Sequence, residues 1–103
     1  MTNEEILEQL GGQRIVREYL RGVTEDSETD RDARRAMLAA IASAGAAGIR
    51  PAMAAAEPEL YAQYCLLLCR QWTDAEDDSA DAIRRQREHL CHQLRYDERN
   101  TDD

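Results

Sequence analysis

The chain has 103 residues and a formal net charge of −8, from 21 acidic residues against 13 basic ones that are all arginines. Its hydrophobic fraction of 43% suits one packed domain and is too high for a disordered tail, and its length leaves no room for a separate catalytic module. The acidic balance argues against broad nucleic-acid binding, which normally requires a basic face.

No segment of the chain has the character of a targeting or membrane sequence. The N-terminus is polar, and apolar runs such as Cys65 to Cys69 are far shorter than the ~20 residues of a membrane span. Three cysteines, an odd number, do not form the disulfide framework of a secreted protein. We therefore expect a soluble protein, made in a cytoplasm, with reduced thiols and no membrane partner.

Composition favours helices throughout, because Ala occurs 16 times and the strand-favouring Val only twice. At the N-terminus, Thr2 and Glu5 have the spacing of a capping box, but Gly11 and Gly12 then interrupt the pattern. Residues 1–12 are therefore predicted to form an N-terminal arm or a short helix outside the main domain.

Two helices are predicted next. The first spans about residues 13–21, and an acidic loop then supplies the N-cap of the second, at about residues 30–44. The apolar positions of the two helices include Ile15, Val16, Tyr19 and Leu20 in the first and Met37, Ala40 and Ile41 in the second.

The third predicted helix begins at Glu57-Pro58-Glu59, after a connection at residues 49–56, and runs to Trp72. Apolar residues cover nearly its whole circumference, which predicts a central helix contacted on several sides. They are Leu60, Tyr61, Tyr64, Cys65, Leu66, Leu67, Leu68, Cys69 and Trp72.

A second acidic loop at residues 73–79 leads to a fourth helix at about residues 79–96, and residues 97–103 are predicted to be a flexible, solvated acidic tail. The predicted fold is all-α, a small bundle of about four helices at residues 13–96 around the apolar third helix. Its expected core includes Tyr19, Leu20, Ile41, Tyr64, Leu67, Leu68, Trp72, Leu90 and Leu94.

Three cysteines and two histidines are the residues that could in principle hold tetrahedral zinc. Their spacing is poor for a zinc site, since Cys65 and Cys69 lie in an apolar helical run, and buried thiols beside surface histidines explain the same residues. Cys91, between His89 and His92, is also a poor nucleophile, because neighbours this close on a helix point in different directions. We predict no catalytic residue, metal or cofactor, with a zinc-stabilised module as a weaker alternative.

Arg84, Arg85 and Arg87 form a local basic patch. The pairs Asp81–Arg85 and Arg84–Glu88 have i,i+4 spacing, so a solvated, salt-bridged face is the simplest interpretation. The alternative is a contact between subunits, because arginine binds carboxylates bidentately and a head-to-tail contact repeated by rotation closes a ring. Its acidic side would be the loop that contains Asp74, Asp77 and Asp78.

Several short motifs follow one another in a fixed order. Glu18-Tyr19-Leu20-Arg21 precedes the first acidic loop, Leu38 to Ile41 lie in the second helix, Tyr64 and Leu66-Leu67-Leu68 precede Trp72, and Leu90 to Tyr96 contain a Leu-x-x-Gln-Leu-Arg ending. In this order and spacing the chain resembles the small all-helical head-tail connector, or adaptor, proteins of long-tailed bacteriophages.

The resemblance implies a non-enzymatic virion protein, made in the bacterial cytoplasm, that forms a homo-oligomeric ring at the head-tail junction, with twelvefold symmetry expected in the virion. Its expected partners are the portal protein and a downstream head-completion or tail protein, while DNA passes through the lumen without specific binding. Charge pairing and the resemblance assign Arg84, Arg85, Arg87, Asp74, Asp77 and Asp78 to subunit contact, and Arg95, Tyr96 and Arg99 to docking of the portal or another partner. The alternative is a small acidic helical regulator that binds a host protein or mimics DNA.

Overall fold

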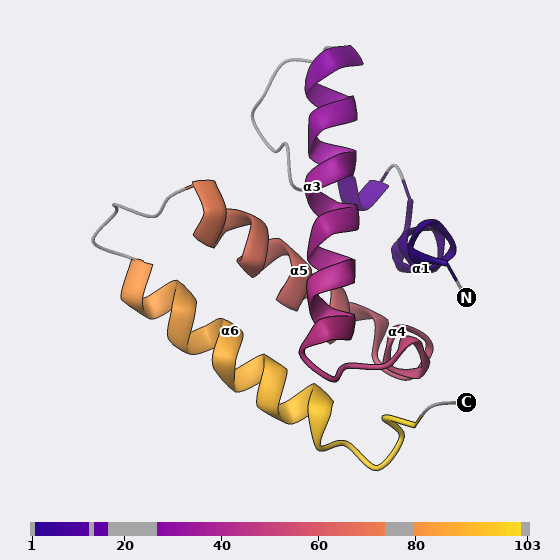
Figure 1. Ribbon diagram of the computed structural model, residues 1–103, viewed down its shortest axis with the longest axis vertical. Coiled ribbons are helices and arrows are strands. Elements are labelled where there is room, and N and C mark those ends of the chain that lie inside the picture. Colours follow the sequence, from indigo (N-terminus) through magenta and orange to yellow (C-terminus); the bar gives the residue numbers. More distant parts are fainter. Residues whose placement is uncertain (1, 13, 17–26, 74–79, 102–103) are drawn as a thin grey trace.

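The computed structural model describes residues 2–12, 14–16, 27–73 and 80–101, with the backbone alone at residues 27–30, 71–73 and 80. Most of these residues are helical and none lies in a strand, which confirms the all-α prediction for the described part of the chain (Figure 1). In chain order the helices are α1 (Asn3–Leu10), α3 (Ser27–Ala46), α4 (Pro51–Ala56), α5 (Pro58–Thr73) and α6 (Ala80–Arg95).

The central element is α5, which packs against α1, α3, α4 and α6. Its first turn contains Pro58 and Glu59, as the start signal predicts, and it continues for 16 residues. Residues on nearly all sides of the helix are buried, so the prediction of a central third helix is confirmed. The buried residues of α5 are Tyr61, Ala62, Tyr64, Cys65, Leu67, Leu68 and Cys69.

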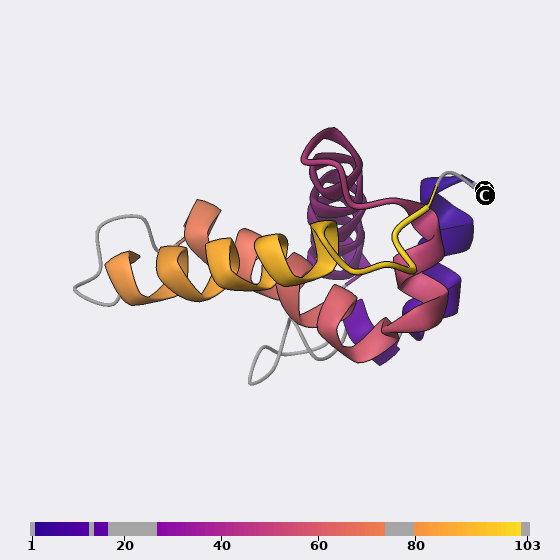
Figure 2. The same ribbon diagram turned by 90° about the horizontal axis from the view of Figure 1, so that it is seen from below.

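The other helices surround α5 from different directions. Figure 1 shows α3 crossing α5 steeply, whereas α6 runs along α5 on the opposite side from α1. Seen from below, α4 and α1 lie together at one end of the molecule and α6 extends away from them (Figure 2). The connection predicted at residues 49–56 contains α4, a six-residue helix with Pro51 at its first position.

Most of the predicted core is confirmed. Ile41, Tyr64, Leu67, Leu68, Leu90 and Leu94 are all buried. Tyr19, Leu20 and the side chain of Trp72 lie outside the described residues. The core also contains residues that the sequence interpretation left out, among them Ile49 just before α4 and Met53 within it.

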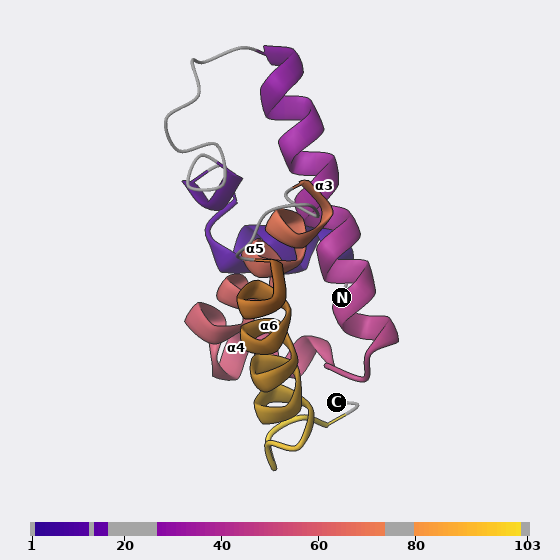
Figure 3. The same ribbon diagram turned by 90° about the vertical axis from the view of Figure 1, so that its left-hand side faces the viewer.

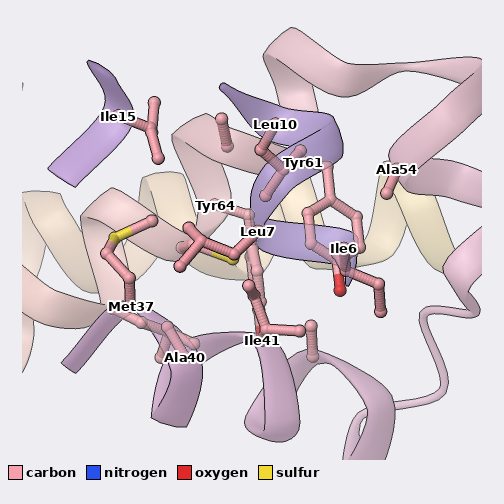
Figure 4. Packing of buried hydrophobic residues seen from close by; sticks show 14 of the residues in the cluster. Ile6, Leu7, Leu10, Ile15, Met37, Ala40, Ile41, Ala54, Tyr61 and Tyr64 are labelled. Carbon is pink, nitrogen blue, oxygen red and sulfur yellow. The ribbon is translucent and has the colours of Figure 1, made fainter. Parts of the chain in front are cut away.

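The N-terminal segment forms the short helix of the two predicted alternatives, but α1 is part of the core and does not lie outside it. Ile6, Leu7 and Leu10 are buried between α3 and α5 (Figure 4). The predicted capping box is present: the Glu5 amide donates to the Thr2 hydroxyl, and the Thr2 amide donates to the Glu5 carboxylate, each at 3.2 Å. Gly11 and Gly12 have positive φ and form the turn after α1, so these glycines fold the helix onto the bundle and do not separate it from a domain.

The C-terminal segment also differs from the expected flexible tail, since it folds back onto the loop between α3 and α4 as far as Thr101. The Asn100 amide group donates to the carbonyl oxygens of Gly48 at 2.9 Å and Arg95 at 2.8 Å, and its oxygen accepts from the Arg50 amide at 2.7 Å. Arg99 bonds to Glu57 at 2.7 Å. These contacts fix the end of α6 to the α4 side of the molecule.

Candidate interaction surface

The candidate surface is the outer side of α6. Leu90 and Leu94 are buried on the inner side, and the partly buried Ile83 packs on the same side. The opposite side is open to solvent and carries a row at positions i, i+4, i+7 and i+11, so its members lie one above another on the helix. This row consists of Arg85, His89, His92 and Tyr96.

The tip of this row is an exposed aromatic group. Tyr96 is 67% exposed, and the His92 ring lies beside it with 4.7 Å between ring centroids. The Arg95 guanidinium lies 5.4 Å from the centre of the Tyr96 ring, within the range of a cation–π contact. Arg95 and Tyr96, two of the residues assigned to partner docking, are therefore adjacent and accessible.

Ion pairs on α6 differ from the predicted i,i+4 pairs. Arg84 pairs with Asp81 at 3.5 Å and Arg87 with Glu88 at 3.8 Å. An exposed pair such as Arg84–Asp81 contributes about 0–1 kcal/mol, so it holds the Arg84 guanidinium only weakly. Arg85 makes no ion pair within the described residues.

Arg87 does not share the outer side with Arg84 and Arg85. Its side chain is only 20% exposed, and it hydrogen-bonds to the buried Tyr64 hydroxyl of α5. Burial and the nearby Cys91 thiol raise the pKa of Tyr64, and the bond from Arg87 opposes that shift. The helical spacing of residue 87 from Ile83, Leu90 and Leu94 could have indicated this inward position, which its charge obscured.

A shallow hollow of about 330 Å³ lies between α5 and one edge of α6. Leu67 and Leu90 supply apolar walls, and Arg85 and His89 stand beside them. Polar and apolar groups therefore meet along the same edge of α6, as at the rim of many protein interfaces.

The last residue assigned to docking, Arg99, is engaged within the chain. It bonds to both carboxylate oxygens of Asp97 at 3.0 Å and to Glu57 at 2.7 Å. The bonds from Arg99 lower the pKa of Asp97 to about 2, and those to Asp97 and Glu57 raise the pKa of Arg99. A partner that binds the Arg99 guanidinium must therefore displace its contact with Asp97 or Glu57.

The cysteines and histidines are split between the core and the surface. Cys65 and Cys69 are buried in α5, and burial raises the pKa of both thiols, that of Cys69 to about 11. The Cys69 thiol lies 3.9 Å from the Met37 sulfur. His89 and His92 are exposed on α6, and no three metal-ligating residues of the described part lie together as a metal site requires.

The acidic side of the predicted subunit contact, Asp74, Asp77 and Asp78, lies outside the described residues. The structure therefore places the basic members of this contact only, with Arg84 and Arg85 facing outward and Arg87 facing inward. Among the helices that the structure describes, none combines the length and apolar character needed to span a membrane.

The chain was compared with known protein families, curated proteins and solved structures. No protein-family model, curated protein or solved structure matches this chain.

Proposed function

We propose that the protein is a structural virion component, a head-tail connector that oligomerises into a ring beneath the portal and joins the DNA-filled head to the tail of a long-tailed bacteriophage. The observation that carries the proposal is the ordered series of connector-like motifs. Two of them lie on adjacent helices: Tyr64 and the three leucines that follow it are on α5, and Leu90 to Tyr96 begin on α6 and end just beyond it. The all-helical fold is compatible with this family.

The surface chemistry supports a role in assembly. Arg84, Arg85 and Arg95 on α6 and Tyr96 just beyond it are exposed. Planar guanidinium and aromatic groups of this kind are enriched at protein interfaces. The net charge of −8 is consistent with a lumen that does not grip the phosphates of passing DNA. Function then resides in the surfaces, with the portal on one side and a head-completion or tail protein on the other.

Light scattering coupled to size exclusion tests the proposal. The purified protein is measured over a range of concentrations, alone and with the portal protein of the same phage. A ring-sized species, formed alone or on the portal, is the expected result, and electron microscopy of that species gives its symmetry. Mass spectrometry of purified virions should also find the chain.

A protein that stays monomeric with the portal present and is absent from virions would contradict the connector role. That result would favour the small acidic regulator. The next measurement would then be affinity capture of host proteins on this chain, to find out whether it binds a DNA-binding protein. Replacing the loop acids Asp74, Asp77 and Asp78 by amides tests their part separately: assembly should weaken if they form the subunit contact.

A further inference from the structure

Charge is distributed unevenly between two helices of the described structure. α1 contains Glu4, Glu5 and Glu8 and no basic residue, which gives it a formal charge of −3. α6 contains four arginines against Asp81 and Glu88, which gives it +2 in a chain whose total is −8. α3 cannot serve as a comparable basic surface, because its three arginines are balanced by Glu28, Asp30 and Asp32.

These two helices lie on opposite sides of the molecule. α5 packs against both of them and separates them (Figure 1). In the view of Figure 3, α6 is nearest the viewer, and α1 lies behind α5. The buried side chains of α1, Ile6, Leu7 and Leu10, turn its glutamates outward. In the same way Leu90 and Leu94 face inward on α6, so that Arg84, Arg85 and Arg95 are exposed on it, whereas Arg87 faces α5.

Each surface contains a charge with no ionic partner inside the described structure. On α1, Glu5 caps the helix and Glu8 pairs with Arg34 at 3.5 Å, but Glu4 makes no ion pair there. On α6, Arg84 pairs with Asp81, but Arg85 makes none. Glu4 and Arg85 are both exposed and so are available to an opposite charge from outside.

We infer that the outer side of α6 docks onto the acidic outer side of α1 of a second copy of this chain. The occupant is a second copy because the complementary charges are both present on the same molecule and on opposite sides of it, so one copy can offer α6 and the next α1. Such a contact is heterologous, and its repetition gives a ring if the rotation closes. The inference rests on the proposed ring-forming function and specifies its two surfaces, with α1 as the acidic side.

A charge-swap experiment tests this pairing. Arg85→Glu makes α6 repel α1 of the next copy, and Glu4→Arg makes α1 repel α6, so each variant alone should self-associate at least about tenfold more weakly than the wild type. An equimolar mixture restores both contacts, because the carboxylate introduced on α6 of one variant can meet the guanidinium introduced on α1 of the other, and the unchanged surfaces still match. Association in the mixture should therefore recover, and rising salt should weaken it.

Arg35→Glu is the matched control, since Arg35 is an exposed arginine of α3 and its replacement makes the same change in net charge away from α6. It should leave the association nearly unchanged. Circular dichroism and thermal unfolding identify any variant that fails to fold. In that case the neutral substitutions Arg85→Gln and Glu4→Gln replace the charge reversals. Each of them should weaken association more than Arg35→Gln does.

Four outcomes would overturn the pairing. The first is a wild-type protein that remains monomeric up to about 1 mM at low salt, and the second is a mixture that associates no more tightly than the single variants. The third is a loss of association in Arg35→Glu equal to that in Arg85→Glu. The fourth is recovery of the association of Arg85→Glu when it is mixed with Asp77→Arg in place of Glu4→Arg. None of them removes the connector role if the portal still recruits the chain, so failure of the pairing and failure of the proposed function are measured separately.

Discussion

At the scale of single residues, Asn100 connects parts of the chain that are about 50 residues apart. Its side chain makes three hydrogen bonds, to Gly48, Arg50 and Arg95. We expect Asn100→Ala to lower the free energy of unfolding by about 1–2 kcal/mol, because three partly exposed bonds are lost together. Urea denaturation measures the change. The neighbouring substitution Thr101→Ala is the control and should stay within about 0.5 kcal/mol of the wild type; equal effects of the two substitutions would show that these bonds do not stabilise the fold.

Asp97 makes the same segment sensitive to acid. Its pKa is lowered to about 2 by hydrogen bonds from Arg99, whereas an unfolded aspartate titrates near about 3.9. A lowered folded-state pKa means that the stabilisation is present above the unfolded value and is lost as pH falls through the folded one. The urea midpoint of the wild type should therefore approach that of Asp97→Asn between about pH 4 and pH 2, while the difference stays constant above about pH 5. In an Arg99→Ala background the same comparison should lose this pH dependence, and a difference that persists there unchanged would exclude Arg99 as its source.

At the scale of elements, the two glycines near the end of α3 have opposite roles. Gly48 has φ +93°, and a Cβ there would lie 3.2 Å from the Arg95 Nε, so Gly48→Ala should destabilise the protein by about 1–2 kcal/mol. Gly45 is helical, and a methyl group at its Cα would have no neighbouring atom within 4 Å, so Gly45→Ala should stabilise the protein by about 0.5–1 kcal/mol. Thermal unfolding gives both values. Changes of the same sign would contradict the assignment of the turn to Gly48.

A further prediction concerns α1, the element that the sequence interpretation left outside the core. Leu7 is fully buried, so Leu7→Ala should cost about 2–5 kcal/mol of stability. Gln9→Ala, at an exposed position of the same helix, should change stability by less than about 0.5 kcal/mol. Chemical denaturation followed by circular dichroism distinguishes the two. Similar small changes for both variants would mean that α1 behaves as an arm or short helix outside the main domain, as the sequence suggested.

Local signals account for which elements could be predicted. The start of α5 and the Thr2 capping box each depend on residues a few positions apart, and both are present in the structure. The docking of α1 depends on the direction that Gly11 and Gly12 give the chain, and adjacent glycines do not encode a direction in the sequence. The C-terminal segment was missed because the partners of Asn100 are far away in the sequence and its neighbours are ordinary surface residues.

The candidate site was predictable in part for the same reason. The concentration of arginine on α6 is visible in the sequence, and so is the apolar spacing that selects its outer side. The same spacing places residue 87 on the inner side, but its bond to the Tyr64 hydroxyl comes from another helix and leaves no local signal in the sequence. The opposite placement of α1 and α6 follows only from the packing of both on α5.

At the scale of the whole molecule, α5 packs against each of the other labelled helices. α1, α3 and α4 contact α5 and also contact one another in part, whereas α6 packs chiefly on α5 and is held at its end by Asn100. An element that packs on one neighbour can separate without opening the rest, which lowers the free energy of its local opening. The architecture thus consists of a core at α5 with α6 as a more separable outer helix.

Hydrogen exchange tests this hierarchy. Amides in the middle of α5, from Tyr64 to Leu68, should exchange the most slowly, with free energies of opening close to that of global unfolding. Amides of α6 should exchange through a smaller opening of lower free energy, because its separation exposes mainly Leu90 and Leu94 and the surface of α5 beneath them. Asn100→Ala should accelerate exchange in α6 more than in α5, since it releases the end of α6 from the loop between α3 and α4. Equal protection of α5 and α6 in the wild type, falling together in the variant, would instead mean that the described helices open as one cooperative unit.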